Sequence, residues 1–171
     1  MHVARLAASD APRYRALMLH AYEAAADAFT STPEERAAQP ESWWVKRIAD
    51  PDSAAFGAFI GDELAGTVTI EFAAKPKTRH KAHLIGMFVC DRLRGQGAGR
   101  ALLEAALEAA AARPGILVVT LTVTEGNVPA IRLYEACGFR TFGVEPMAIA
   151  TPTGLKSKVH MWLQLHDAKS G

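Results

Sequence analysis

The sequence is poor in cysteine, in long apolar runs and in excess charge, and each scarcity excludes a class of protein. Two cysteines, Cys90 and Cys137, are too few for a metal-binding set or a disulfide framework. We therefore expect no metal and two small buried thiols. No apolar run approaches the roughly 18 residues of a membrane span, and no signal-peptide core is visible, so we expect a cytoplasmic protein without membrane contact. The 19 basic and 18 acidic residues leave a net charge of +1, which gives no reason to expect a nucleic acid partner.

The length of 171 residues, half of them apolar, suits one buried core and is short for two ordinary domains. We expect a single domain over residues 1–166 and a disordered tail over 167–171. No internal repeat and no linker interrupts the domain.

The hydrophobic pattern predicts alternating helices and strands. A short strand over 3–7 precedes three helical pieces, for which Asp10, Thr32 and Ser42 are the expected N-caps. The period then changes to two, which predicts an antiparallel meander. Its strands cover 55–60, 64–73 and 83–89. After a helix that ends near residue 112, a β-branched strand over 117–124 is expected to be buried on both faces. A helix over 127–137 and strands from 139 and over 159–165 complete the chain.

A glycine-rich loop joins the strand that ends at Val89 to the helix that follows. Gly95, Gly97 and Gly99 remove Cβ atoms at the mouth of that helix, where the first N–H groups have no intrahelical partner. Such a helix N-terminus favours an anion.

Three arginines flank this loop. Arg92, Arg94 and Arg100 have only Asp91 as a nearby acid in the sequence. A cation in the first turn of a helix is unfavourable by about 0.3–1 kcal/mol unless a negative group offsets it. A bound phosphate would do so; three solvated arginines are the simpler alternative.

The spacing of the loop distinguishes between kinds of phosphate site. A Walker loop is excluded because no Gly-Lys-Ser/Thr follows, and a dinucleotide fingerprint is excluded because its third glycine falls on Arg100. The run Arg94-x-x-Gly97-x-Gly99 resembles the Q/R-x-x-G-x-G/A signature of the GNAT superfamily of acyl-CoA-dependent N-acetyltransferases.

A second segment carries the same resemblance. The run Asn127-x-x-Ala130-x-x-x-Tyr134-x-x-x-Gly138-Phe139 is similar to the GNAT pattern N-x-x-A-x-x-x-Y-x-x-x-G-F. Asn127 and Tyr134 are separated by about two helical turns, so they share one helix face. From the residues alone, Asn127 would be interpreted as an N-cap and Tyr134 as a core residue.

The resemblance implies an α/β (α+β) fold. Its central sheet is mixed and mostly antiparallel, with about seven strands and helices on both faces. The strands over 84–89 and 117–123 splay apart, and the acyl donor, acetyl-CoA, lies in the gap. In relatives, main-chain groups of the splayed strand pair with pantetheine and amides of the loop hold the diphosphate. The residues so implied are Phe88, Val89, Arg94, Gly95, Gln96, Gly97, Ala98, Gly99, Arg100, Asn127 and Tyr134.

Acyl transfer from a thioester requires a positioned amine, a proton acceptor, oxyanion stabilisation and help for the leaving thiolate. The resemblance places Tyr134 at the sulfur, and a main-chain N–H near Val89 could stabilise the oxyanion. His83 occupies the position of a glutamate base in histone-acetylating relatives, and a histidine near pKa 6.5 can accept a proton at neutral pH. Glu71, His160 or a chain of waters are the alternatives.

The sequence thus predicts an N-acetyltransferase that uses acetyl-CoA and acts on a primary amine of a small molecule or of a peptide or protein N-terminus, by direct attack in a ternary complex. The alternative is a non-catalytic acyl-CoA-binding domain. Relatives often form homodimers, so a homodimer is possible. The scarcity of clustered carboxylates argues against an aminoglycoside as acceptor. The candidate acceptor pocket consists of Tyr22, Phe29, Trp43, Glu145, Met147 and His160.

Overall fold

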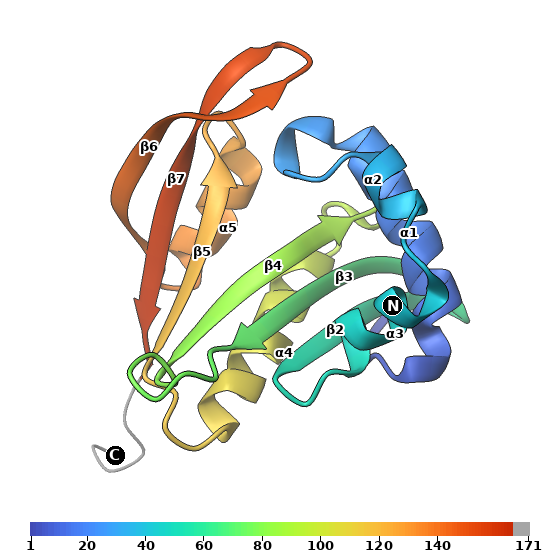
Figure 1. The fold of residues 1–171 in the computed structure, drawn as a ribbon, viewed down its shortest axis with the longest axis horizontal. Coiled ribbons are helices and arrows are strands. Elements are labelled where there is room, and N and C mark those ends of the chain that lie inside the picture. The colour runs from blue at the N-terminus through green and yellow to red at the C-terminus, as the bar shows by residue number, and fades with distance from the viewer. Residues whose placement is uncertain (166–171) are drawn as a thin grey trace.

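One seven-stranded sheet organises the protein. The computed structural model describes residues 1–165, so the predicted tail at 167–171 lies outside them. The strands follow the order β1-β2-β3-β4-β5-β7-β6 (Figure 1). Only β4 and β5 are parallel neighbours, and the other pairs are antiparallel. The mixed, mostly antiparallel sheet is confirmed. Its strands are β1 His2–Arg5, β2 Ser53–Ile60, β3 Glu63–Phe72, β4 Lys81–Val89, β5 Val118–Thr124, β6 Arg140–Thr151 and β7 Gly154–Gln164.

Helices cover both faces of the sheet, as expected. One apolar cluster packs α4 and α5 against the sheet, and a second packs α1 and α3 against the opposite side. No helix within the described residues is long and apolar enough to cross a membrane. The helices are α1 Ala11–Ala24, α2 Pro33–Ala37, α3 Glu41–Ala49, α4 Ala98–Ala112 and α5 Val128–Ala136, with 3-10 turns η1 Ala8–Asp10, η2 Ala26–Ala28 and η3 Asp91–Leu93.

The parallel strands β4 and β5 separate after three residue pairs. They pair from Lys81 with Val118 to His83 with Thr120, and then diverge (Figure 1). Beyond that point β4 contains a bulge, since its register with β3 shifts between Thr67 and Thr69. Gly86, opposite this shift, has a φ of 62°, which a residue with a Cβ rarely adopts. A bulge bends its strand and increases the twist. The predicted splay is confirmed.

Two helix caps follow the prediction. Thr32 accepts a hydrogen bond from the Glu35 N–H at 3.1 Å, and the Glu35 carboxylate accepts one from the Thr32 N–H at 2.9 Å. This reciprocal capping box begins α2. Asn127 caps α5 by accepting a hydrogen bond from the Ala130 N–H at 3.4 Å.

The other two predicted caps have different outcomes. Asp10 occupies the N-cap position of α1 as predicted, but its carboxylate accepts a hydrogen bond from the Ala7 N–H at 2.7 Å and makes no cap hydrogen bond to α1. Helix α3 begins at Glu41, with Pro40 as its N-cap, so Ser42 lies inside the helix. Pro40 makes no side-chain cap hydrogen bond, and its carbonyl accepts the hydrogen bond from the Trp43 N–H at 3.0 Å.

The predicted burial is also wrong in two places. One face of strand β5 is buried through Val119, Leu121 and Val123, whereas on the other face Thr124 is buried and Val118, Thr120 and Thr122 are half-buried. The β-branched composition of the strand reflects strand propensity more than a complete second packed layer. Cys90 and Cys137 are half-buried at the edge of the core, and the described residues contain no cluster of metal-ligand type.

Candidate active site

A cavity of about 260 Å³ lies in the gap between β4 and β5. Its walls come from the 83–87 segment of β4, the 121–124 segment of β5, and parts of α1, α5 and the chain around η2 and α2. Both predicted catalytic side chains, His83 and Tyr134, line this cavity. Residues 51 positions apart in the chain are thus brought to one enclosed space.

His83 lies at the narrow end of the gap, on the last pair of β4 and β5. Its Nδ1 atom is 2.8 Å from the Thr120 hydroxyl oxygen. The same hydroxyl oxygen lies 3.4 Å from the Ala82 carbonyl oxygen. A carbonyl oxygen can only accept a hydrogen bond, so in this contact Thr120 must be the donor. If the Thr120 proton points to Ala82, the Thr120 oxygen accepts from Nδ1–H. This arrangement leaves Nε2 as the nitrogen with a free lone pair.

The surroundings keep His83 neutral. Burial lowers the pKa of His83 below its usual 6.5, and the positive charges of Lys81 and Lys158 act in the same direction. The Glu71 carboxylate, on the paired residue of β3, opposes this shift. A neutral imidazole at pH 7 can accept a proton, so the chemistry expected of His83 is available at this position.

Tyr134 reaches the cavity from α5. Its side chain is buried, and its ring packs edge-on against Phe139 at 5.9 Å between centroids. Burial raises the pKa of Tyr134 to about 12. Among residues 1–165 no hydrogen-bond partner is found for its hydroxyl, so a ligand in the cavity could accept its proton in a hydrogen bond. Asn127, two turns earlier, lines the same cavity, as the spacing predicts.

Each glycine of the loop has its own structural reason. Gly95 and Gly97 have φ values of 75° and 78°, and a Cβ at either position would meet nothing within 4 Å. They allow the left-handed turn that begins α4, and the space beside them is open to a ligand. Gly99 instead permits a close approach, because its Cβ would lie 3.2 Å from the Leu133 side chain and 3.6 Å from that of Met87. The loop therefore abuts β4 and α5 beside the cavity.

The arginines near the loop are paired, contrary to the expectation that Asp91 is the only nearby acid. Arg94 pairs with Asp91 at 3.1 Å and Arg100 with Glu104 at 2.9 Å. Arg92 pairs with Glu63, which the turn between β2 and β3 brings to the loop. These are exposed pairs, which solvent screens, so they contribute little to stability. The arginines can therefore release their carboxylate partners and bind a phosphate instead at little cost in free energy.

The direction of the main chain differs between Phe88 and Val89. The Cys90 N–H donates to the Ala65 carbonyl of β3 at 2.8 Å. Main-chain groups of successive residues in a strand point to opposite edges, and those of alternate residues to the same edge. The Phe88 N–H therefore points to β3, whereas that of Val89 points to the gap. The Phe88 ring is buried in the cluster under α1.

The predicted acceptor pocket is only partly right. Tyr22 and Phe29 line the cavity, but Trp43, Glu145, Met147 and His160 do not. Met147 is 74% exposed, and His160 pairs with Glu145 at 3.1 Å outside the cavity. Trp43 is separated from the cavity by Arg36 and Arg47, whose guanidinium carbons lie 4.5 and 5.5 Å from its ring centroid.

Several cavity residues have no clear signal in the sequence. Arg36, Arg47 and Lys158 line the cavity from α2, α3 and β7, although they are far apart in the chain. The bulge at Gly86 had a weak signal, since an isolated glycine within an apolar strand often marks a bulge. The three charged residues look like ordinary surface positions in their own segments.

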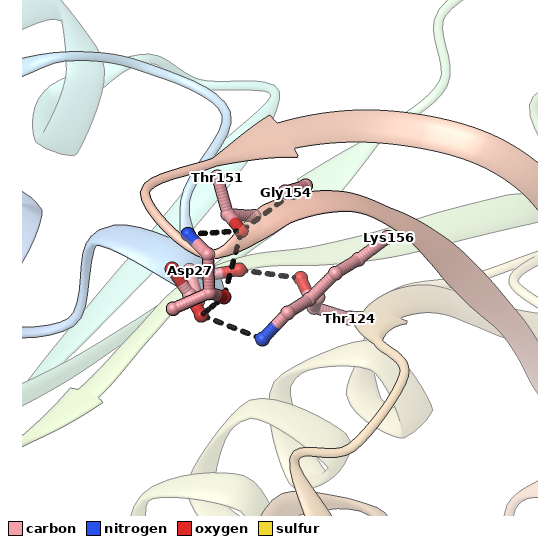
Figure 2. A network of polar contacts seen from close by, with 6 residues as sticks. Asp27, Thr124, Thr151, Gly154 and Lys156 are labelled. Atoms are coloured by element: carbon pink, nitrogen blue, oxygen red, sulfur yellow. Dashed lines mark hydrogen bonds and ion pairs between the residues drawn. The ribbon is translucent and has the colours of Figure 1, made fainter.

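A polar network closes the wide end of the gap. Figure 2 shows Asp27 of η2 between the β6–β7 turn and Thr124, the last residue of β5. The Lys156 ammonium donates to the Asp27 carboxylate at 2.7 Å, and the Thr124 hydroxyl donates to the Asp27 carbonyl at 2.7 Å. Segment 28–31, which follows Asp27, lines the cavity. The network therefore holds one wall of the cavity in place.

Comparison with known proteins links this geometry to a family. The model of the acetyltransferase (GNAT) family matches residues 18–139. Streptothricin acetyltransferase from Escherichia coli is 31% identical over 114 residues, which are 67% of this chain and 63% of that protein. The L-amino acid N-acetyltransferase AaaT from Escherichia coli strain K12 is 31% identical over 101 residues, 58% of this chain and 62% of that protein. The match thus spans less than two thirds of either relative.

The fold has a counterpart among solved structures. The yncA protein from Salmonella typhimurium, whose structure contains acetyl-CoA, superposes with a TM-score of 0.79 at 18% identity. The superposition covers 98% of this chain and 95% of that protein. At this identity the likeness establishes the fold alone.

Proposed function

Because this chain belongs to the GNAT family of acetyltransferases, we propose that it transfers an acetyl group from acetyl-CoA to a primary amine of a small molecule or of a peptide or protein N-terminus. The observation that carries the proposal is that His83 and Tyr134 line one cavity in the gap between β4 and β5. A proton acceptor and a hydrogen-bond donor thus face the same small space, as direct attack in a ternary complex requires.

The fit of acetyl-CoA to this site is supported by the open space at Gly95 and Gly97. We propose that amides from Gly95 to Arg100 hold the diphosphate, with Gln96 and Ala98 contributing through their main chain. The first N–H groups of α4 lack partners by helix geometry. Arg94 supplies positive charge. Asn127 orients the bound molecule beside Tyr134.

For the pantetheine arm we propose Val89. Phe88 was the other sequence-based candidate, but its main chain points to β3, and its side chain packs under α1. The bulge at Gly86 turns the main chain beside the cavity. An N–H at this bulge or at Val89 is placed to stabilise an oxyanion.

The proton steps follow from the two pKa shifts. The nitrogen of the acceptor amine bonds to the acetyl carbon, and His83 Nε2 accepts the proton that this nitrogen loses. The bond between the acetyl carbon and sulfur then breaks. The pKa of Tyr134 is about 12, whereas that of a thiol is about 8.5, so full proton transfer to the thiolate would cost about 5 kcal/mol. Tyr134 is therefore assigned a hydrogen bond to the thiolate, which takes its proton from solvent.

The alternative of a non-catalytic acyl-CoA-binding domain is less well supported. A binding module needs the glycine loop but has no need for a neutral histidine opposite a buried phenol. Both side chains line the cavity here. The relatives named above, a streptothricin acetyltransferase and an L-amino acid N-acetyltransferase, point to catalysis on different amines.

Location and assembly remain proposals. A cytoplasmic location follows from the same sequence argument as before. For a homodimer, the candidate contact is the edge strand β6, where Phe142 is 60% and Val144 55% exposed. A sedimentation experiment that finds a monomer at all concentrations would exclude the homodimer.

The test of the proposed function is thiol release. The purified protein is incubated with acetyl-CoA and a broad panel of amines, and free thiol and acetylated product are both measured. Thiol release that depends on an amine, with a matching acetylated product, is expected. Tight binding of acetyl-CoA with no product from any amine would instead favour the binding module.

A further inference from the structure

The cavity between β4 and β5 is positively charged. Arg36, Arg47 and Lys158 line it, and no aspartate or glutamate of the described residues does. Cations that line a partly enclosed space raise the local potential, because the walls exclude screening water. A ligand with a negative group would be attracted there.

Arg36 and Arg47 are held in position by an aromatic platform. Their guanidinium carbons lie 4.5 and 5.5 Å from the ring centroid of Trp43. Trp43 in turn packs edge-on against Trp44, at 4.9 Å between centroids, and Trp44 is fully buried. A guanidinium on an aromatic ring keeps its N–H groups free to bind an anion in its own plane. The stacking thus preorganises the two guanidinium groups for binding an anion.

The two arginines are weakly paired within the protein. Among residues 1–165 Arg36 makes no ion pair, and the ion pair of Arg47 with Glu71 is long, at 3.6 Å, with the Glu71 side chain 47% exposed. Both side chains nevertheless line the cavity. An anionic group bound in the cavity would therefore supply the closer partner that both guanidinium groups lack.

We infer that the acceptor is a small amine that also carries a carboxylate, of the α-amino acid type. Its carboxylate binds Arg36 and Arg47, whose fork of N–H groups matches the two oxygens. Its amine then points along the cavity toward His83. This inference rests on the proposed acetyl transfer and names the class of acceptor for the same site.

The charge of the cavity also suits the chemistry of such an acceptor. Neighbouring cations lower the pKa of a bound ammonium, so they favour the neutral amine that attacks the thioester. A polyamine would be repelled by the same three side chains. In a peptide the α-carboxylate next to the N-terminal amine is replaced by an amide, so a peptide N-terminus would leave the arginines without an anionic partner.

The test compares matched pairs of acceptors. Common α-amino acids are each assayed beside their amides and their decarboxylated amines, with saturating acetyl-CoA and thiol release as the readout. We expect kcat/KM to favour the best amino acid over its amide by about tenfold or more, the usual effect of a lost charge-assisted contact. The amino group of the amide is less basic and so is more often neutral, which by itself would favour the amide. A preference for the amino acid would therefore come from its carboxylate.

Variants assign the preference to the arginines. Arg36→Gln is expected to raise KM for the amino acid by about tenfold while KM for acetyl-CoA and for the amide stays the same. Arg36→Lys keeps the charge and should restore part of the affinity. Arg79→Gln, in the exposed turn before β4, is the matched control and should change nothing. Thermal melting of each variant separates a lost contact from a lost fold.

Other outcomes would overturn the inference. Equal use of amino acids and amides, or a preference for tripeptides over free amino acids, would contradict it while leaving acetyl transfer intact. An equal loss by Arg36→Gln on amino acid and amide would also contradict it. If calorimetry detects acetyl-CoA binding but no amine is acetylated, the proposed function itself fails.

Discussion

His83 Nδ1 lies 2.8 Å from Thr120 Oγ1, where β4 and β5 make their last pair before the gap opens. The contact joins β4 and β5, the one pair of adjacent strands that is parallel within residues 1–165. It also restrains the orientation of the imidazole, and donation of the Thr120 proton to the Ala82 carbonyl would favour the tautomer with Nε2 unprotonated. The proposed base thus lies at the point where the two strands diverge.

His83→Gln is expected to lower kcat by about 100-fold, as for loss of a general base. Because the pKa of His83 is lowered below 6.5, the base is active above its folded pKa and lost as the pH falls through that value. In the pH profile of kcat at saturating amine, the loss of activity that belongs to His83 should therefore lie below pH 6.5, and His83→Gln should lose this acid limb. His80→Gln, in the exposed turn, is the control. An unchanged acid limb in His83→Gln would assign the base elsewhere.

Thr120→Val removes the hydroxyl but keeps the shape of the side chain. We expect kcat to fall by about fivefold to tenfold, the effect of one lost hydrogen bond, with KM for acetyl-CoA unchanged. Thr122→Val, on the same strand, is the matched control. NMR of the histidine ring nitrogens would report the tautomer directly, and a protonated Nε2 in the unmodified protein would contradict this account.

Tyr134→Phe is expected to lower kcat by about 10- to 100-fold through loss of the hydrogen bond to the thiolate. The affinity for acetyl-CoA, measured by calorimetry, should stay near that of the unmodified protein. Since the pKa of Tyr134 is about 12, its deprotonation should not reduce activity below about pH 11. Tyr22→Phe, in the same cavity, controls for the loss of a buried hydroxyl. Full activity of Tyr134→Phe would remove Tyr134 from the mechanism.

Gly97→Ala tests the loop against a matched position. Gly97 and Gly115 have φ values of 78° and 87°, and a Cβ would meet nothing within 4 Å at either. Both alanine variants should lose about 1–2 kcal/mol of stability from left-handed strain. Only Gly97→Ala should also weaken acetyl-CoA binding, because only its Cβ enters the proposed diphosphate site. Equal affinities in the two variants would contradict that site.

Asp27→Asn tests the polar network at the wide end of the gap. The hydrogen bond from Lys156 lowers the pKa of Asp27 below its usual 3.8. The contribution of the charged form is therefore present above pH 3.8 and lost as the pH falls through the folded pKa. At pH 7 the variant should show faster amide exchange over residues 26–31. Asp52→Asn, which breaks an exposed pair with Arg113, should not affect this segment, and unchanged exchange in Asp27→Asn would exclude the role.

Local features of this fold could be predicted, and features that depend on distant contacts could not. The glycine loop and the cap at Asn127 lie in continuous segments, where spacing determines geometry. The residues of the Arg92–Glu63 pair are 29 positions apart in the chain. Arg36 and Lys158 line the same cavity only because the complete sheet brings α2 close to β7. Trp43 packs against the buried core and does not line the cavity, and periodicity alone left both positions open because it shows which way a side chain points but not which side chains cover it.

The most direct test of the account is a crystal structure of the protein with bound coenzyme A. The account predicts diphosphate oxygens within hydrogen-bond distance of the amides from Gly97 to Arg100. It also predicts the sulfur between β4 and β5, against the Tyr134 hydroxyl and on the cavity that His83 lines. A diphosphate bound away from the start of α4, or a sulfur outside the gap, would contradict it.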